Sequence, residues 1–265
     1  MTKQSYVLWG SIAALCVVSL GGGFAVSAIS VRESSCNVVG YTVYGDLVTS
    51  YAFAGGEESG MQSFSEDIAT GVQESNKDDK IKAILVEIDS YGGQPVAAEE
   101  IANALKRSDK PTVALIRTVG TSAAYWAATG ADVIFASKNS DVGSIGVKLS
   151  LLNQVKKNQD EGISYLTISS APYKDLGDPN RQLTQEERVL LQKDVDIIHE
   201  NFVNAVSENR EISIADVRAL ADGRSMLGSI ALEKHLIDKI GDQQDAEAYL
   251  AEIIGEEVGV CWQTE

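Results

Sequence analysis

The middle of the chain alternates between strand-like and helix-like patterns, and this alternation constrains the fold more than any other feature. Runs rich in β-branched residues predict strands over residues 81–88, 112–117 and 133–136. Helices are expected between them, over residues 95–106, which begin with a proline, and over residues 121–130. Strands and helices in this order form right-handed crossovers. We therefore predict an α/β fold with a largely parallel sheet.

The same criteria predict further elements on both sides of this region. Glycine-containing turns are expected to end the first two strands, at residues 90–93 and 119–121. An early strand, a helix and a later strand are expected over residues 38–44, 151–160 and 163–169. Thr184 and Glu187 have the spacing of a capping box, which predicts a long amphipathic helix ending near residue 209. Three shorter helices should follow, over residues 214–220, 225–234 and 245–254.

The N-terminal segment has 28 residues without a charge, between Lys3 and Arg32. A helix rises about 1.5 Å per residue, so this stretch can cross a hydrocarbon core of roughly 30 Å. Small residues at 26–28 would also suit a signal-peptide cleavage site, but the apolar run is longer than a usual signal peptide. We expect a retained transmembrane helix and short linker over residues 1–37, followed by one domain over residues 38–265.

Charge and cysteine usage limit the partners and cofactors. The chain has 22 basic and 38 acidic residues and no basic run, which opposes binding to nucleic acid. Cys16 lies in the apolar stretch, and the three cysteines have no metal-ligand spacing, so we expect no metal site from them. Cys36 and Cys261 bracket the expected domain. They could form a disulfide in an oxidising compartment, but we take two unpaired thiols as the default.

Histidine is too scarce here to favour a Ser-His-Asp triad. The two histidines, His199 and His235, both fall in predicted helices rather than in glycine-rich turns. We expect each to lie on a helix surface or at an interface.

Ser122 is the best-placed candidate nucleophile. It follows the predicted strand and turn that end at Thr121, and it opens a predicted helix. Ala123 and Ala124 beside it are small enough to let a peptide approach. A serine at a helix start is more often a helix cap, so Ser122 alone does not establish a catalytic site. Without a histidine, such a serine would need a lysine desolvated enough to be neutral near pH 7.

Four segments resemble, in order and spacing, the active-site segments of the signal peptide peptidase A (protease IV) family. They are residues 89–93 (DSYGG), 121–126 (TSAAYW), 142–147 (VGSIGV) and 173–175 (YKD). The resemblance runs from about residue 38 to 242 and includes the ADGR turn at residues 221–224. It implies that Ser122 is the nucleophile, Lys174 is the general base and Ser144 hydrogen-bonds the lysine.

The resemblance also implies an oxyanion hole. The backbone N–H groups of Gly93 and Ala123 would donate to the tetrahedral intermediate, with Gly92 allowing close approach of the backbone. The chain departs from the family pattern nearby, with Tyr91 where a proline is usual and Gln94 where a glycine is usual. Ala123 and Ala124 likewise stand where the family prefers two glycines. These departures bear on the efficiency of the site.

The family resemblance implies a Clp-protease/crotonase-like fold with repeated ββα units and an N-terminal transmembrane helix. It further implies a membrane-associated serine endopeptidase that uses no metal and no cofactor, cleaves peptides such as remnant signal peptides and assembles into a homo-oligomeric ring. The protein would be single-pass in the cell membrane, with its catalytic domain on the extracytoplasmic side. Alternatives are a non-catalytic membrane scaffold of the same fold, an acyl-CoA-handling crotonase-like enzyme and a viral capsid-maturation peptidase.

Overall fold

The computed structural model describes residues 36–53 and 60–263. The predicted transmembrane helix lies outside these residues. Within the described part of the chain, no helix has both the length and the hydropathy needed to cross a membrane.

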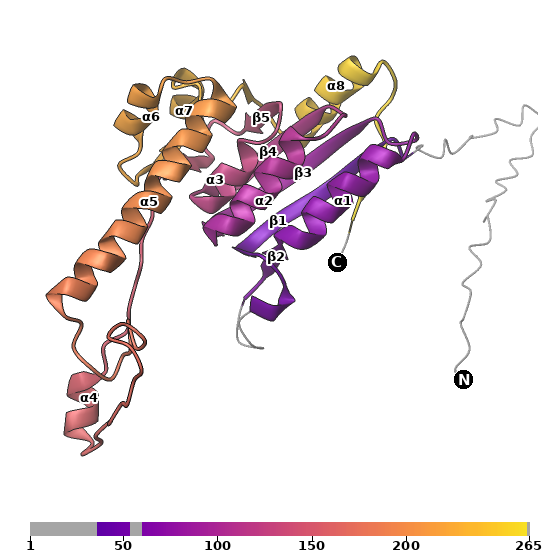
Figure 1. The fold of residues 1–265 in the computed structure, drawn as a ribbon. Helices are drawn as coiled ribbons and strands as arrows, with labels where there is room; N and C mark the ends of the chain where they lie inside the picture. The colour runs from indigo at the N-terminus through magenta and orange to yellow at the C-terminus, as the bar shows by residue number, and fades with distance from the viewer. Residues whose placement is uncertain (1–35, 54–59, 264–265) are drawn as a thin grey trace, which may run out of the picture. The chain divides into compact units, whose positions relative to one another are not determined.

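The described residues form a nine-stranded sheet with helices on both faces (Figure 1). The strands are β1 (Val38–Val48), β2 (Gln62–Phe64), β3 (Ala83–Gly93), β4 (Thr112–Thr121), β5 (Val133–Ala136), β6 (Asp141–Gly143), β7 (Ser225–Leu227), β8 (Lys239–Ile240) and β9 (Val260–Trp262). The helices are α1 (Ser65–Lys77), α2 (Pro95–Lys106), α3 (Ala123–Ala128), α4 (Val155–Asp160), α5 (Gln185–Arg210), α6 (Ile214–Leu220), α7 (Gly228–Glu233) and α8 (Gln243–Ile254), with a 3-10 turn η1 (Tyr51–Phe53).

The sheet is almost entirely parallel, as predicted. Its main order is β2-β1-β3-β4-β5-β8, with β6 beside β4 and β9 beside β1. The pair β6 and β7 is antiparallel, whereas the other strand pairs among the described residues are parallel. Two strands precede a helix at β1-β2-α1 and at β5-β6-α4, and the units between them have one strand and one helix.

The apolar run of β3 is continuous because both faces of this strand are covered. Ile84, Val86 and Ile88 belong to the core cluster that also contains buried residues of α1, α2 and α3. Leu85 points to the other face, into a second cluster that includes Leu250 of α8. Burial of each such side chain contributes about 1.5–3 kcal/mol. The central strands are therefore held from both sides, which gives the site a stiff support.

The predicted turns at residues 90–93 and 119–121 are wrong, because both segments continue their strands. β3 still pairs with β1 past an irregularity between Tyr44 and Asp46, so that Gly92 lies opposite Asp46. The end of β4 pairs with β6, with Gly120 opposite Val142. These pairings involve segments distant in sequence, which outweigh the local turn preference of glycine.

The predicted strand at residues 163–169 is also wrong. This segment has no regular structure, and Leu166 and Ile168 are 89% and 92% exposed. An alternating apolar pattern needs a neighbouring strand, and the described residues of this chain supply none here. Helix α4 is shorter than predicted and lies with this segment beyond the N-terminal end of α5 (Figure 1).

Local signals were sufficient for several helices. Helices α2 and α6 and strand β5 have the predicted bounds, and α5 begins with the predicted capping box of Thr184 and Glu187. Helix α1 was not predicted, because its sequence is mostly polar and its buried apolar side chains are those of Ile68 and Val72. The predicted helix at 225–234 begins instead with β7, which pairs with β6.

Cys36 and Cys261 are paired in a disulfide, with a Cα–Cα distance of 5.6 Å. The default of two unpaired thiols is therefore corrected. Strand β9 runs beside β1, with Val38 opposite Val260 and Val39 opposite Cys261. This pairing of the two ends of the domain brings the cysteines within the usual bridging distance.

Candidate active site

Ser122 lies between the end of β4 and the start of α3, on a strained backbone. Its φ is 54° and its ψ is −128°, a conformation that side chains other than glycine rarely adopt. The Ser122 N–H donates to the Gly143 carbonyl at 2.8 Å, and its carbonyl accepts from the Trp126 N–H at 3.0 Å. Such strain costs about 1–3 kcal/mol and is concentrated at functional sites.

The helix-cap alternative for Ser122 is not supported. Among the described residues, its side chain makes no hydrogen bond that caps α3. All residues of α3 are buried, and the Tyr125 hydroxyl donates to the Leu236 carbonyl at 2.8 Å. Complete burial raises the pKa of Tyr125, so this hydroxyl stays a neutral donor. The turn that carries Ser122 is thus fixed to a buried helix.

Gly92 packs directly against this turn. A Cβ added at Gly92 would lie 2.9 Å from the Ala123 nitrogen and 3.0 Å from the Ser122 Cβ, and its φ is 113°. Ser90 stabilises the neighbouring backbone, because its Oγ accepts from the Gly92 N–H at 3.0 Å. At Gly93, an added Cβ would lie 2.1 Å from the Leu47 carbonyl oxygen. Glycine is therefore required at both positions by backbone packing.

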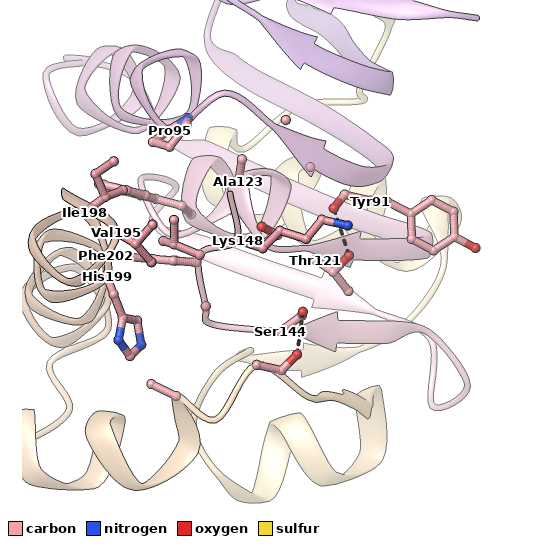
Figure 2. Close-up of a pocket in the computed structure, with 18 of the residues that line it drawn as sticks. Tyr91, Pro95, Thr121, Ala123, Ser144, Lys148, Val195, Ile198, His199 and Phe202 are labelled. Atoms are coloured by element: carbon pink, nitrogen blue, oxygen red, sulfur yellow. Dashed lines mark hydrogen bonds between the residues drawn. The ribbon is translucent and has the colours of Figure 1, made fainter. Parts of the chain in front are cut away.

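Tyr91 does not fill the space around Ser122. Its side chain is 78% exposed and points away from the other labelled residues in Figure 2. Its carbonyl accepts a hydrogen bond from the Thr121 hydroxyl at 3.3 Å. The backbone of the loop is therefore tied to β4 despite the missing proline.

Ser144 also has a positive φ, 51°, and lies in the same cleft as Ser122. Its Oγ donates to the Gly223 carbonyl at 2.8 Å, and its N–H donates to the Arg224 carbonyl at 3.1 Å (Figure 2). In this chain the Ser144 hydroxyl thus contacts the ADGR turn rather than a lysine.

A cleft of about 830 Å³ contains these residues (Figure 2). Ser122, Ala123, Gly92, Gly93 and Ser144 all line it. Its apolar wall comes from α3 and α5, where the Trp126 and Phe202 rings stack at a centroid distance of 4.9 Å. Apolar walls with few polar groups suit a peptide side chain.

Lys174 is not brought to this cleft within one chain. It is exposed in an irregular segment between α4 and α5, and it is not among the residues that line the cleft. The chain leaves the sheet after β6 and returns to it only through α5, which begins at Gln185. Lys174 therefore belongs to the segment between α4 and α5, and this segment lies beyond the N-terminal end of α5 (Figure 1). The lysine that does line the cleft is Lys148, whose side chain is exposed (Figure 2).

Sequence reasoning missed both basic residues that line the cleft within the described chain, Lys148 and His199. His199 was expected on a helix surface or interface, and it lies on the face of α5 that lines the cleft. Its Nε2 is buried without a hydrogen-bond partner within the described chain. Helical spacing could have identified His199, because the residues of α5 that line the cleft share one face of the helix. These residues are Gln192, Val195, Asp196, Ile198, His199 and Phe202.

Part of the chain matches known peptidases in sequence. The sequence profile described as Peptidase family S49 matches residues 104–256, which include Ser122, Ser144 and Lys174. A candidate protease of Methanocaldococcus jannaschii is 37% identical over 172 residues, covering 64% of this chain and 55% of the relative. A protein of Enterococcus faecium named as a candidate signal peptide peptidase SppA is 32% identical over 184 residues, covering 68% and 54%. The chain thus spans little more than half the length of these relatives.

Solved structures show the same fold at low sequence identity. A ClpP1 variant from Listeria monocytogenes matches with a TM-score of 0.50 and 14% identity, covering 78% of this chain and 92% of that one. The fold and the matches define a peptidase with a Clp-protease-like architecture. The chain belongs to peptidase family S49.

Proposed function

We propose that the protein is a membrane-associated serine endopeptidase that cleaves peptides such as remnant signal peptides. Ser122 is the nucleophile and Lys174 is the general base. The observation that carries the proposal is the strained turn of Ser122, packed against Gly92 in a cleft with an apolar wall. The family match favours this activity over the acyl-CoA alternative.

The reaction would proceed through an acyl-enzyme. The Ser122 Oγ attacks the carbonyl carbon of the scissile bond while Lys174 accepts the hydroxyl proton. Lys174 then returns that proton to the leaving amine, and water hydrolyses the ester in a second step. The backbone N–H groups of Gly93 and Ala123 stabilise the oxyanion, each worth about 3 kcal/mol of the barrier. The Ser144 Oγ, which donates to the Gly223 carbonyl, can still accept a hydrogen bond from the lysine amine and so orient it.

The base would come from a neighbouring copy of the chain. Lys174 lies away from the cleft of its own chain, whereas it belongs to the segment in which the exposed apolar residues are concentrated. These include Leu149, Leu152, Tyr165, Leu166 and Ile168, with Val189 on α5. Burial of these side chains between copies would stabilise a homo-oligomeric ring and place each Lys174 beside the next Ser122.

Two observations support the proposal that the catalytic domain lies outside the cytoplasm. The charge-free stretch between Lys3 and Arg32 is long enough for a single membrane span. The disulfide between Cys36 and Cys261 is a bond that persists in oxidising compartments.

The test uses the full chain in detergent and a fluorogenic apolar peptide. Ser122→Ala and Lys174→Ala should each lower kcat by roughly 10³-fold or more while the fold is retained. Mixing the two variants in equal amounts, with subunit exchange, should restore about a quarter of the sites, because half of the subunits supply each residue. Recovery on mixing would show that the site is shared between copies.

Lys148→Ala separates the two candidate bases. It should stay active, because Lys148 lines the cleft without being the base. If Lys148→Ala were silent and Lys174→Ala active, Lys148 would be the base and would act within one chain. A parent protein that is inactive between about pH 7 and 10 would instead favour the non-catalytic scaffold.

A further inference from the structure

The segment that carries Lys174 is irregular but is anchored on both sides of the lysine. Before it, the Tyr173 hydroxyl donates to the Glu186 carboxylate. After it, the Asp175 carboxylate accepts from Arg181. The Lys174 side chain itself has no hydrogen bond or ion pair with residues 36–53 or 60–263. The position of the lysine therefore depends on what holds its two neighbours.

Arg181 is the centre of this anchoring. Its Nε donates to Asp175 Oδ2 at 2.7 Å, and its Nη2 donates to Asp175 Oδ1 at 3.1 Å and to the Asp175 carbonyl at 3.0 Å. On its other side, Nη1 donates to Glu187 Oε2 at 2.9 Å, and Nη2 also contacts the Glu187 carboxylate. One planar guanidinium thus bridges two carboxylates in a forked geometry that a lysine cannot reproduce.

Glu187 fixes this bridge to α5. Its side chain is only 4% exposed, and its carboxylate also accepts from the Thr184 N–H at 2.9 Å, as the capping box requires. The Arg181 guanidinium, followed by the hydrogen bond from Thr184, lowers the pKa of Glu187 to about 2. The carboxylate is therefore ionised throughout the range in which a peptidase works, and the bridge stays intact.

Helix α5 links this bridge to the cleft. Its first turn holds Glu186 and Glu187, while Val195, His199 and Phe202 further along line the cleft. We propose that Arg181 is a positioning residue for catalysis, which clamps the Asp175 side of the lysine turn to the first turn of α5 and so fixes where Lys174 is presented. This inference rests on the proposed role of Lys174 as the general base.

A purely structural role for Arg181 would act only on the start of α5. The capping box already satisfies that helix end, because Glu187 accepts from the Thr184 N–H and the Thr184 hydroxyl accepts from the Glu187 N–H. Three of the Arg181 contacts instead go to Asp175, the residue directly after Lys174. The contacts therefore serve the lysine turn as much as the helix.

The test compares Arg181→Ala and Arg181→Lys in the full chain. A misplaced catalytic group costs up to about 10²-fold, so both variants should lose about 10-fold to 100-fold in kcat with little change in KM. The ascending limb of the pH profile of kcat/KM should move to higher pH, because a loosely held ammonium is better solvated and keeps its proton longer. Guanidinium ion at low millimolar concentration should restore part of the activity of Arg181→Ala, and none of that of Lys174→Ala.

Arg218→Ala is the matched control. Arg218 forms a comparable ion pair with Glu200 at 2.6 Å, but on an exposed surface, so its loss should leave kcat and the pH profile unchanged. Asp175→Asn keeps the capping box and replaces one of the two carboxylate acceptors of Arg181 by an amide donor. It weakens the lysine side of the bridge, so it should reproduce the kinetic defect even if Arg181→Ala folds poorly.

The outcomes separate this inference from the proposed function. If Lys174→Ala is silent while Arg181→Ala and Asp175→Asn keep the parental kcat and pH profile, Lys174 is the base and the positioning role is refuted. If Lys174→Ala is as active as the parent, the base assignment fails and the positioning role fails with it. Loss of kcat with a shifted pH limb in Asp175→Asn supports both.

Discussion

Gly92 lies so close to Ser122 that a Cβ at position 92 would be 3.0 Å from the Ser122 Cβ. The backbone at the end of β3 is thus packed against the turn that carries Ser122. Both residues have positive φ angles, which glycine adopts without strain at position 92 and which strain the backbone at Ser122. The position of the Ser122 hydroxyl is set by this contact as much as by α3.

Gly92→Ala should lower kcat by about 10²-fold, because the added methyl group displaces the Ser122 turn. The free energy of unfolding should fall by about 1–3 kcal/mol from the positive φ. Peptide cleavage and chemical denaturation measure the two effects. The matched control is Gly255→Ala, which also has a positive φ, 72°, but no atom within 4 Å of the added Cβ. It should lose stability and keep kcat, and an equal loss of kcat in both variants would contradict the steric explanation.

The disulfide between Cys36 and Cys261 should stabilise the pairing of β1 with β9. Replacement of both cysteines by serine should lower the free energy of unfolding by about 2–4 kcal/mol. The cleft lies elsewhere on the sheet, so kcat at low temperature should be kept. Thermal unfolding of the parent with and without reductant measures the effect. An unchanged Tm on reduction would show that the two ends of the domain are held without the bridge.

Glu187 should make the start of α5 sensitive to acid. Its pKa is lowered to about 2, so its stabilising contribution is fully present above its unfolded value of about 4.3. That contribution is lost as the pH falls toward about 2. The difference in Tm between the parent and Glu187→Gln should therefore be largest above about pH 4.5 and shrink below it. A difference that stays constant from neutral pH to about pH 2 would show that Arg181 does not stabilise the ionised form.

The sequence predicted correctly those elements whose structure depends on residues nearby in the chain. The bounds of α2 and the capping box of Thr184 and Glu187 follow from local patterns and matched the structure. The continuation of β3 through Gly92 could not be read locally, because it depends on pairing with Asp46 of β1. The exposed segment at 163–169 shows the opposite error, since its alternating pattern has no partner strand in the described chain.

The residues of the candidate site also differ in whether a local sequence pattern could predict them. Ser122 could be singled out as a candidate from its place between a strand and a helix, with its catalytic role assigned through family resemblance, whereas Lys174 was chosen only through that resemblance. No local sequence pattern predicts the distance between Lys174 and Ser122, because this distance depends on the path of the chain between β6 and α5. His199 lies on the same helical face as Val195 and Phe202, and projecting α5 as a wheel would have placed it on the wall of the cleft.

The separation of Lys174 from the cleft of its own chain has a consequence for control of the enzyme. If each base serves the serine of the next copy, a freshly made chain is latent, and assembly replaces the removal of a propeptide as the activating event. Dilution would then return the enzyme to a zymogen-like state without any covalent change. Proteolysis would be confined to places where enough copies have gathered to close the contacts between them.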